Sequence, residues 1–226
     1  MWDYSGCSLA CFFAAELQAS YAPELSFAGA AMGRLPSNVT QLFATINGGS
    51  TAGFIVSILL GVTAEFPAVR DYLTGDLKTE GSYNAIGFLA CLHYDALEFL
   101  TTYAGQDIFE YLLNGKDILT GSELACVIGN NAFPTYHGIP QIPLFVDKAI
   151  PDELTSIEST DRHIQRYCDA YADVLYQRNT VGSHDAESLN GAPRAFEWLA
   201  RWLNGNTTQF ISGCTAETVT VDLSQS

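Results

Sequence analysis

The sequence predicts an α/β fold in which a mainly parallel sheet carries a helical insertion between two of its strands. Two short apolar runs, residues 25–31 and 142–146, lack polar alternation, as expected of parallel strands that are buried on both faces. Between these runs, from residue 32 to residue 140, apolar residues recur at helical spacing. Strands that alternate with helices are typical of a parallel sheet, so the helical stretch is expected to form a cap inserted between two strands.

The remaining elements follow the same alternation. Residues 9–17 are apolar and rich in alanine, which predicts a buried helix near the start of the chain. After the second apolar run, the pattern predicts a polar helix over residues 160–172 and a strand near residues 174–177. A last helix is expected from about residue 193 to residue 203, because its apolar residues share one face.

These elements divide the chain into three segments. Residues 1–31 hold the first helix and the strand that follows it, and residues 32–140 form the helical cap or lid. Residues 141–226 hold the rest of the sheet and its helices.

Composition and charge exclude several classes of protein. Apolar residues make up 48% of the 226 residues and charged residues only 15%, which is typical of a globular chain. The net charge of -15 argues against nucleic acid and anionic membrane surfaces as partners. The longest apolar stretch, residues 52–62, has about half the length of a bilayer span, and no signal peptide is visible at the start.

The cysteines and histidines do not predict a metal site. No two cysteines have C-x-x-C spacing, and His93, His137 and His163 have no mutual spacing that suggests a metal ion, so no cofactor is expected. Six cysteines leave many disulfide pairings open. Sequons at Asn38 and Asn206 predict glycosylation, which together with the cysteine content fits a secreted protein.

Three residues form a candidate catalytic group. Ser5 precedes the first predicted helix, Asp152 follows the second apolar run, and His184 lies in a loop after the last predicted strand. Serine, acid and histidine occur in this order in α/β-hydrolases. A serine hydroxyl needs an imidazole to become a nucleophile, and the imidazole needs an acid to fix its tautomer. Sites in parallel sheets form outside the carboxyl ends of the strands, so we expect the three side chains to meet there.

Each of these residues also has a structural interpretation. Ser5 could cap a helix, Asp152 could cap a turn, and His184 could be an ordinary loop residue. Asp147 and Asp185 are the competing acids, and order in the chain does not exclude them.

Several segments resemble the fungal secretory lipases, the family of Candida antarctica lipase A. The likeness is carried by Tyr4-Ser5-Gly6, Ser20-Tyr21-Ala22-Pro23-Glu24-Leu25, Asn47-Gly48-Gly49 with Ala52-Gly53-Phe54, and Ala149-Ile150-Pro151-Asp152-Glu153. The resemblance implies an α/β-hydrolase fold whose helical cap covers an acyl-chain tunnel. By position, it implies a nucleophile at Ser5, a triad acid at Asp152, a base at His184, an oxyanion-hole N–H at Gly6 and a disulfide between Cys168 and Cys214.

The chain departs from the family pattern in two ways. The family has glycine two residues before and two residues after the nucleophile, where this chain has Asp3 and Cys7. The family also has a long segment ahead of the nucleophile that holds the first strands of its sheet. By this comparison the chain looks like the C-terminal part of a secretory lipase, with a partial α/β-hydrolase fold.

The resemblance implies a secreted serine hydrolase that cleaves carboxylic esters, a triacylglycerol lipase or esterase that works through an acyl-enzyme. Its expected partners are a lipid or acyl-ester substrate and, transiently, a lipid interface. No nucleic acid and no specific protein partner are expected. The alternative is a catalytically silent lipase fragment that serves as a lipid-binding or partner-binding module.

Overall fold

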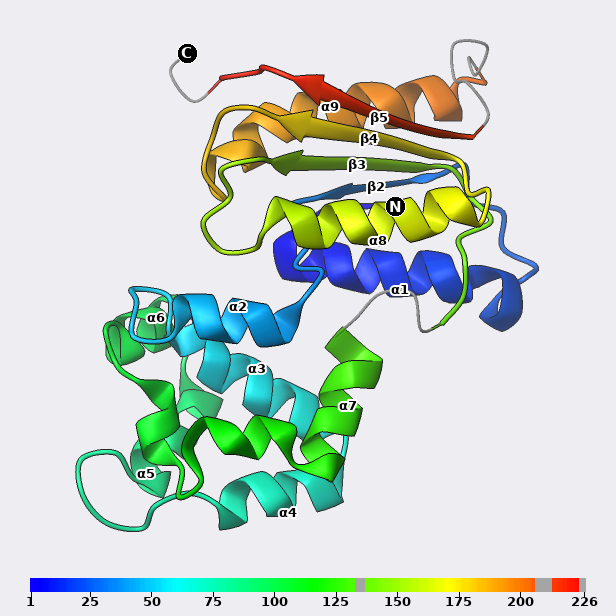
Figure 1. The fold of residues 1–226 in the computed structure, drawn as a ribbon. Coiled ribbons are helices and arrows are strands. Elements are labelled where there is room, and N and C mark those ends of the chain that lie inside the picture. The colour runs from blue at the N-terminus through cyan, green and yellow to red at the C-terminus, as the bar shows by residue number, and fades with distance from the viewer. Residues whose placement is uncertain (133–136, 206–212, 224–226) are drawn as a thin grey trace. The chain divides into compact units, whose positions relative to one another are not determined.

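The computed structural model describes residues 1–132, 137–205 and 213–223, which form two compact units (Figure 1). One unit comprises Met1–Asn38 and Pro134–Ser226 and contains the sheet. The other comprises Val39–Phe133 and is helical. The helical unit is thus inserted in the chain between the second and third strands.

The sheet has five strands in the order in which they occur along the chain. Every neighbouring pair is parallel, which confirms the predicted mainly parallel sheet. The strands are β1 (Trp2–Tyr4), β2 (Ala30–Gly33), β3 (Leu144–Ala149), β4 (Val174–Asn179) and β5 (Cys214–Val219).

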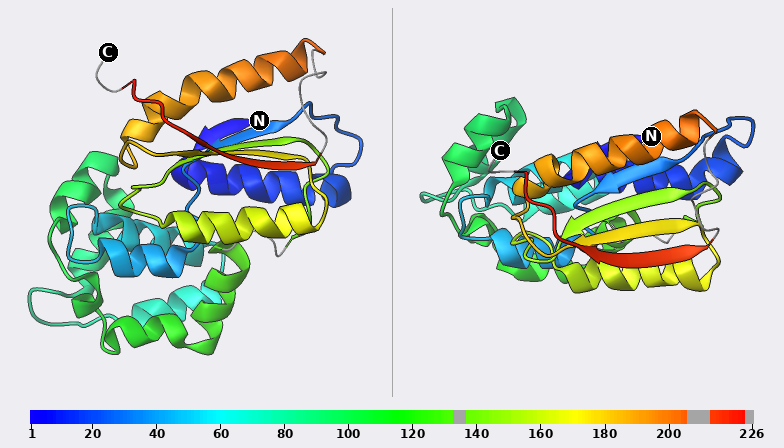
Figure 2. Two further views of the ribbon diagram at one scale, coloured as in Figure 1. Left: turned by 45° about the horizontal axis from the view of Figure 1, so that its top comes forward. Right: turned by 90° about the horizontal axis from the view of Figure 1, so that it is seen from above.

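Helices cover both faces of the sheet, as Figures 1 and 2 show. Helices α1 (Ser5–Tyr21) and α8 (Ile157–Asp169) lie on one face, and α9 (Ala186–Leu203) lies on the other. Because side chains alternate along a strand, β3 sends Val146 into the core under α1 and α8 and Phe145 into the core under α9. Burial of both faces explains why β2 and the start of β3 read as continuous apolar runs.

The strands β2 and β3 begin later than the apolar runs predict. Residues 25–29 are not part of the sheet, because Ala30 is paired with Leu144, the first residue of β3, and no strand lies alongside the residues before it. Pro143 lacks an N–H group, so the ladder of β3 starts at the next residue. That strand then continues through Asp147 and Lys148, two buried ionisable residues that an apolar pattern cannot predict.

The edge strand β5 was not predicted, and the expectation of a helix as the last element is wrong. The residues of β5 are exposed or half-buried along the whole strand, so the sequence of β5 contains no apolar run. It forms a strand because it pairs with β4 over its full length.

The helix boundaries also differ from the prediction. Helix α1 runs from Ser5 to Tyr21 and so extends beyond the apolar stretch 9–17 at both ends. Helix α8 starts at Ile157, before the predicted residue 160, because the Ser156 side chain caps it by accepting from the N–H of Ser159. Helix α9 starts at Ala186, about two turns before the predicted start, and contains Pro193 in its interior.

The helical unit consists of α-helices and short 3-10 helices. Its central helix α3 is apolar on nearly all sides, and Ile55, Val56 and Leu59 are buried. Among residues 39–132, the only β pairing is an isolated bridge between Leu77 and Leu112. The α-helices are α2 (Val39–Ile46), α3 (Gly53–Ala64), α4 (Pro67–Gly75), α5 (Ala85–Leu89), α6 (Ala96–Tyr103) and α7 (Ser122–Ala132). The 3-10 helices are Ala90–His93, Ile108–Tyr111 and Gly115–Thr120.

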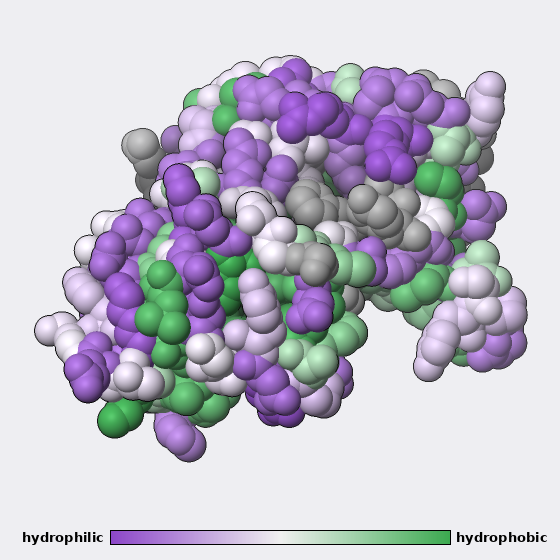
Figure 3. All heavy atoms as spheres, turned by 60° about the horizontal axis from the view of Figure 1, so that its bottom comes forward, coloured by the Kyte–Doolittle hydropathy of each residue, from purple (hydrophilic) through white to green (hydrophobic). Residues whose placement is uncertain are grey.

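Large apolar side chains also reach the surface of the helical unit. Ile86, Leu92, Leu97 and Leu113 are each more than half exposed, and Figure 3 shows apolar areas between polar ones on this unit. The role of the unit as a cap stays a prediction.

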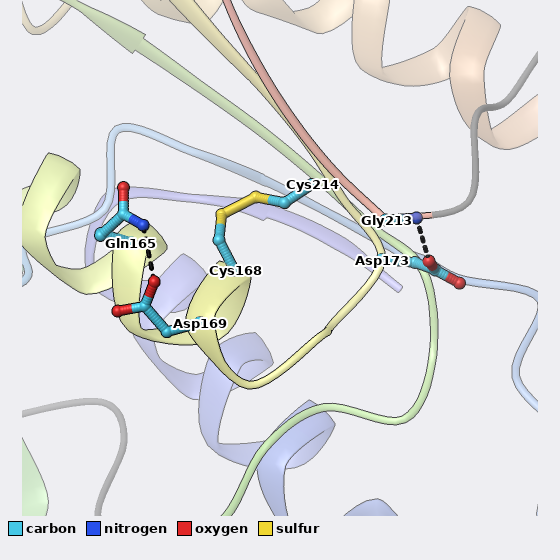
Figure 4. The surroundings of a disulfide bond; sticks show 6 residues. All are labelled: Gln165, Cys168, Asp169, Asp173, Gly213 and Cys214. Atoms are coloured by element: carbon cyan, nitrogen blue, oxygen red, sulfur yellow. Dashed lines mark hydrogen bonds between the residues drawn. A yellow bond between two sulfur atoms is a disulfide. The ribbon is translucent and has the colours of Figure 1, made fainter.

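A disulfide joins Cys168, near the end of α8, to Cys214, the first residue of β5 (Figure 4). Beside it, the Asp173 carboxylate accepts a hydrogen bond from the N–H of Gly213 at 2.5 Å. The edge strand is therefore tethered where it enters the sheet. Cys7, Cys11, Cys91 and Cys126 have free thiols.

We expect Cys214→Ser to lower the free energy of unfolding by about 3–4 kcal/mol, because the bridge links residues 46 positions apart and restricts the unfolded chain. Chemical denaturation measures this loss, and hydrogen exchange should show faster exchange of the β5 amides. Cys126→Ser removes an exposed free thiol and serves as the control. Equal stability of the two variants would contradict the expectation.

Candidate active site

Ser5 lies in a strained turn between a strand and a helix. Strand β1 ends at Tyr4, and α1 begins directly at Ser5. The φ angle of Ser5 is 52°, in the left-handed region that residues other than glycine rarely adopt. Such strain at a strand-to-helix turn is typical of a nucleophile elbow, where it holds the hydroxyl out of the helix.

The side chains that replace the family's two glycines are accommodated in this turn. The carboxylate of Asp3 accepts a hydrogen bond from the N–H of Tyr4 at 2.8 Å, and Cys7 is exposed. Neither substitution prevents the left-handed conformation of Ser5. Gly6 is also exposed, and a Cβ atom on it would meet no other atom within 4 Å.

The structure brings the three predicted catalytic residues together. Ser5 Oγ lies 3.0 Å from His184 Nε2, and His184 Nδ1 lies 2.9 Å from Asp152 Oδ2. The three residues follow β1, β4 and β3, so they meet at the carboxyl edge of the parallel sheet. When the carboxylate is ionised, Nδ1 carries the imidazole proton and Nε2 is left to accept the hydroxyl proton.

Asp152 is held by donors on both of its oxygens. Oδ1 accepts from the N–H groups of Leu154 and Thr155 at 2.9 Å and 3.0 Å. Oδ2 accepts from Lys148 Nζ at 2.7 Å and from the Thr155 hydroxyl at 3.3 Å, in addition to its contact with His184. The side chains of Asp152 and Lys148 are both fully buried. These contacts leave the carboxylate a single orientation.

The surroundings of Asp152 favour its ionised form. Burial alone would raise the pKa of this carboxyl group, but the hydrogen bond with His184 and the positive charge of Lys148 outweigh burial and hold the pKa well below its usual range. Burial lowers the pKa of the Lys148 ammonium, and the Asp152 carboxylate opposes that shift. At neutral pH the acid beside His184 is therefore charged.

Two further residues hold the backbone of His184. Its N–H donates to Glu153 Oε2 at 2.8 Å, and its carbonyl accepts from an Arg34 nitrogen at 2.6 Å. The sequence alone did not predict these roles for Arg34 and Glu153, or that of Lys148. Only Glu153, the direct neighbour of Asp152, had a signal in the sequence, since it belongs to the segment shared with the secretory lipases.

Neither competing acid touches the imidazole. Asp185 is 97% exposed and faces Arg34 at 3.7 Å. Asp147 is fully buried under α9, so close to Gly191 that a Cβ atom there would overlap its carboxylate. Neither oxygen of Asp147 has a hydrogen-bond partner among the described residues. Burial, reinforced by the charge of Glu187, raises the pKa of Asp147 to about 8.

The structure describes only one of the two predicted glycosylation sites. Asn38 is half-buried just before α2, and Asn206 lies outside the described residues. Glycosylation stays a prediction at both positions.

The described part of the chain has no group of three or more side chains that could bind a metal ion. Its helices are all too short or too polar to span a bilayer.

Comparison with known proteins assigns the family. The family model described as secretory lipase matches residues 1–210 of this chain. The chain belongs to the secretory lipase family. This confirms the resemblance found in the sequence.

Individual relatives and solved structures agree with this assignment. The trichothecene C-3 esterase of Fusarium sporotrichioides is 42% identical over 202 residues, which are 88% of this chain and 45% of that protein. Lipase A of Arthroderma benhamiae is 32% identical over 231 residues, covering 100% of this chain and 47% of the relative. The chain thus spans about half the length of the curated relatives that it matches.

The X-ray structure of Candida antarctica lipase A superposes with a TM-score of 0.83 at 24% identity, over 97% of this chain and 51% of that one. This similarity confirms that the chain has the fold of the α/β-hydrolase lipases. The match covers only part of the lipase A chain.

We expect Asp147→Asn to stabilise the protein at pH 8. The pKa of about 8 in the folded state lies above the ordinary value of 3.8, so folding favours the protonated acid. The stability that this proton contributes is present below about pH 4 and is lost as the pH rises toward 8. Asparagine is neutral throughout and should not show this loss.

Thermal unfolding of the native chain and the variant at pH 5 and pH 8 tests this. At pH 8 the variant should melt at least about 4 °C higher, with a smaller difference at pH 5. Asp71→Asn, at an exposed position, is the control. A variant that melts below the native chain at pH 8 would contradict this expectation.

Proposed function

We propose that this chain acts as a secreted serine hydrolase that cleaves carboxylic esters, with Ser5, His184 and Asp152 as its catalytic triad. The observation that carries the proposal is the unbroken hydrogen-bond sequence from the Ser5 hydroxyl through His184 to Asp152. The left-handed turn at Ser5 supports the proposal independently, since an ordinary helix cap does not require it.

In the proposed reaction, Ser5 Oγ attacks the ester carbonyl carbon while His184 Nε2 takes the hydroxyl proton. The buried Asp152 carboxylate stabilises the imidazolium that forms. The N–H of Gly6 donates to the oxyanion of the tetrahedral intermediate. Collapse of that intermediate breaks the ester C–O bond, and His184 gives the proton to the departing alcohol. Water then attacks the acyl-enzyme in the same way, which releases the carboxylic acid and restores Ser5.

Carboxylic esters are the substrate class that the names of the relatives share. One is called a trichothecene C-3 esterase and others are called lipases, and both names denote enzymes that cleave esters. We propose acyl esters, including triacylglycerols, as substrates. The exposed apolar side chains of the helical unit support transient contact with lipid or acyl chains.

Secretion is part of the same proposal. The disulfide between Cys168 and Cys214 supports it, because such bonds persist in oxidising compartments. The matching family model is also described as secretory.

Ser5→Ala should lower the rate of p-nitrophenyl butyrate hydrolysis at pH 8 by at least about 1000-fold, because the variant has no nucleophile. Ser20→Ala, on the exposed surface of the same helix, is the matched control and should keep the native rate. Substantial residual activity in Ser5→Ala would refute the assigned nucleophile. A folded native chain without esterase activity would favour the alternative, a silent lipid-binding or partner-binding module.

Asp152→Asn should lower kcat by about 1000- to 10 000-fold, because asparagine neither fixes the imidazole tautomer nor stabilises the imidazolium. KM should change little, since the lost interaction strengthens only in the transition state. Asp147→Asn should keep most of the activity, because that acid does not reach His184. If Asp147→Asn loses its activity while Asp152→Asn keeps it, Asp147 is the triad acid.

A further inference from the structure

Arg34 has an unusual backbone conformation beside the candidate site. It follows β2 at the carboxyl edge of the sheet, and its φ angle of 55° lies in the left-handed region. Its N–H is fixed by a hydrogen bond of 2.9 Å to the carbonyl of Asp147 on β3. Glycine would adopt this conformation without strain, so an arginine here suggests that the side chain has a task.

The Arg34 side chain links the two segments that carry Ser5 and His184. One guanidinium nitrogen donates to the carbonyl of His184 at 2.6 Å. The guanidinium carbon lies 4.9 Å from the centre of the Tyr4 ring, within the range of a cation–π contact. Tyr4 is the residue directly before Ser5. The arginine thus contacts His184 itself and the residue that precedes Ser5.

These two contacts are largely shielded from water. The Arg34 side chain is only 11% exposed, whereas Asp185, its ion-pair partner at 3.7 Å, is 97% exposed. An ion pair with so exposed a partner contributes little. The buried carbonyl and the aromatic ring are therefore the contacts that hold the guanidinium in place.

From this geometry we propose that Arg34 is a positioning residue that fixes the His184 loop against the strand leading into Ser5. The inference rests on the function proposed above. Ser5 and His184 follow different strands of the sheet. A displacement of about 1 Å between reacting groups can slow a reaction by about 100-fold. Arg34 acts through His184 and Tyr4 and does not itself touch the reacting atoms.

The test measures how fast a fluorophosphonate labels Ser5 in the 226-residue chain. In this reaction Ser5 Oγ bonds to phosphorus, fluoride leaves and His184 accepts the proton, so the rate reports the serine–histidine geometry without a known substrate. The variants are Arg34→Gly and Arg34→Asn, since both residues tolerate the left-handed conformation. Arg162→Ala removes an exposed guanidinium from α8 and is the control.

We expect Arg34→Gly and Arg34→Asn to label about 10- to 100-fold more slowly than the native chain, with melting temperatures close to native. Guanidinium chloride at tens of millimolar should partly restore the rate of Arg34→Gly by entering the vacated space, and sodium chloride at the same concentration should not. Arg34→Lys should stay slow, because an ammonium group does not provide the flat surface that stacks on Tyr4. Arg162→Ala should label at the native rate.

Native labelling rates in Arg34→Gly or Arg34→Asn would overturn the inference and leave the proposed function intact. A slow rate that follows a drop in melting temperature and does not respond to guanidinium would also overturn it, since Arg34 would then only support the fold. If Arg34→Gly does not fold, the rate of Arg34→Asn decides. A folded native chain that is never labelled would refute the proposed function itself.

Discussion

The candidate site depends on one buried charge, the carboxylate of Asp152. An isolated carboxylate in a protein interior is strongly disfavoured and would take up a proton. Here backbone N–H groups of Leu154 and Thr155 satisfy one oxygen, while Lys148 and His184 share the other. The charge therefore persists, and its direction toward His184 is fixed. Everything that the site can do with the Ser5 hydroxyl follows from that fixed charge, because it sets which nitrogen of His184 is free to accept a proton.

The alternation of side chains along a single strand, β3, places the cation beside Asp152. Asp147 and Lys148 are adjacent on β3, both are buried, and they point to opposite faces. Lys148 meets Asp152, whereas Asp147 lies against α9 with its pKa raised by burial. A shift of one residue in the strand register would exchange the two side chains and remove the cation from Asp152. The register of β3 is thus part of the site as well as of the core.

Sequence reasoning located Ser5, Asp152 and His184 because their chain order and neighbouring residues carry a recognisable pattern. It could not locate Arg34, which donates to the backbone carbonyl of His184, a group with no signature in the sequence. Lys148 precedes Asp152 by only four residues, but nothing in the sequence indicates that their side chains meet. Apolar runs indicated β2 and β3, but β5 is mostly exposed and forms a strand only because β4 pairs with it. The apolar stretch 9–17 indicated the body of α1, whereas the strained turn at Ser5 and not local helix propensity decides where that helix begins.

A crystal structure of the 226-residue chain after reaction with a fluorophosphonate tests the central claim most directly. The account predicts phosphorus bonded to Ser5 Oγ, a phosphoryl oxygen beside the N–H of Gly6, and an intact hydrogen bond between His184 Nδ1 and Asp152 Oδ2. An adduct on another residue, or a His184 ring turned away from Asp152, would contradict it.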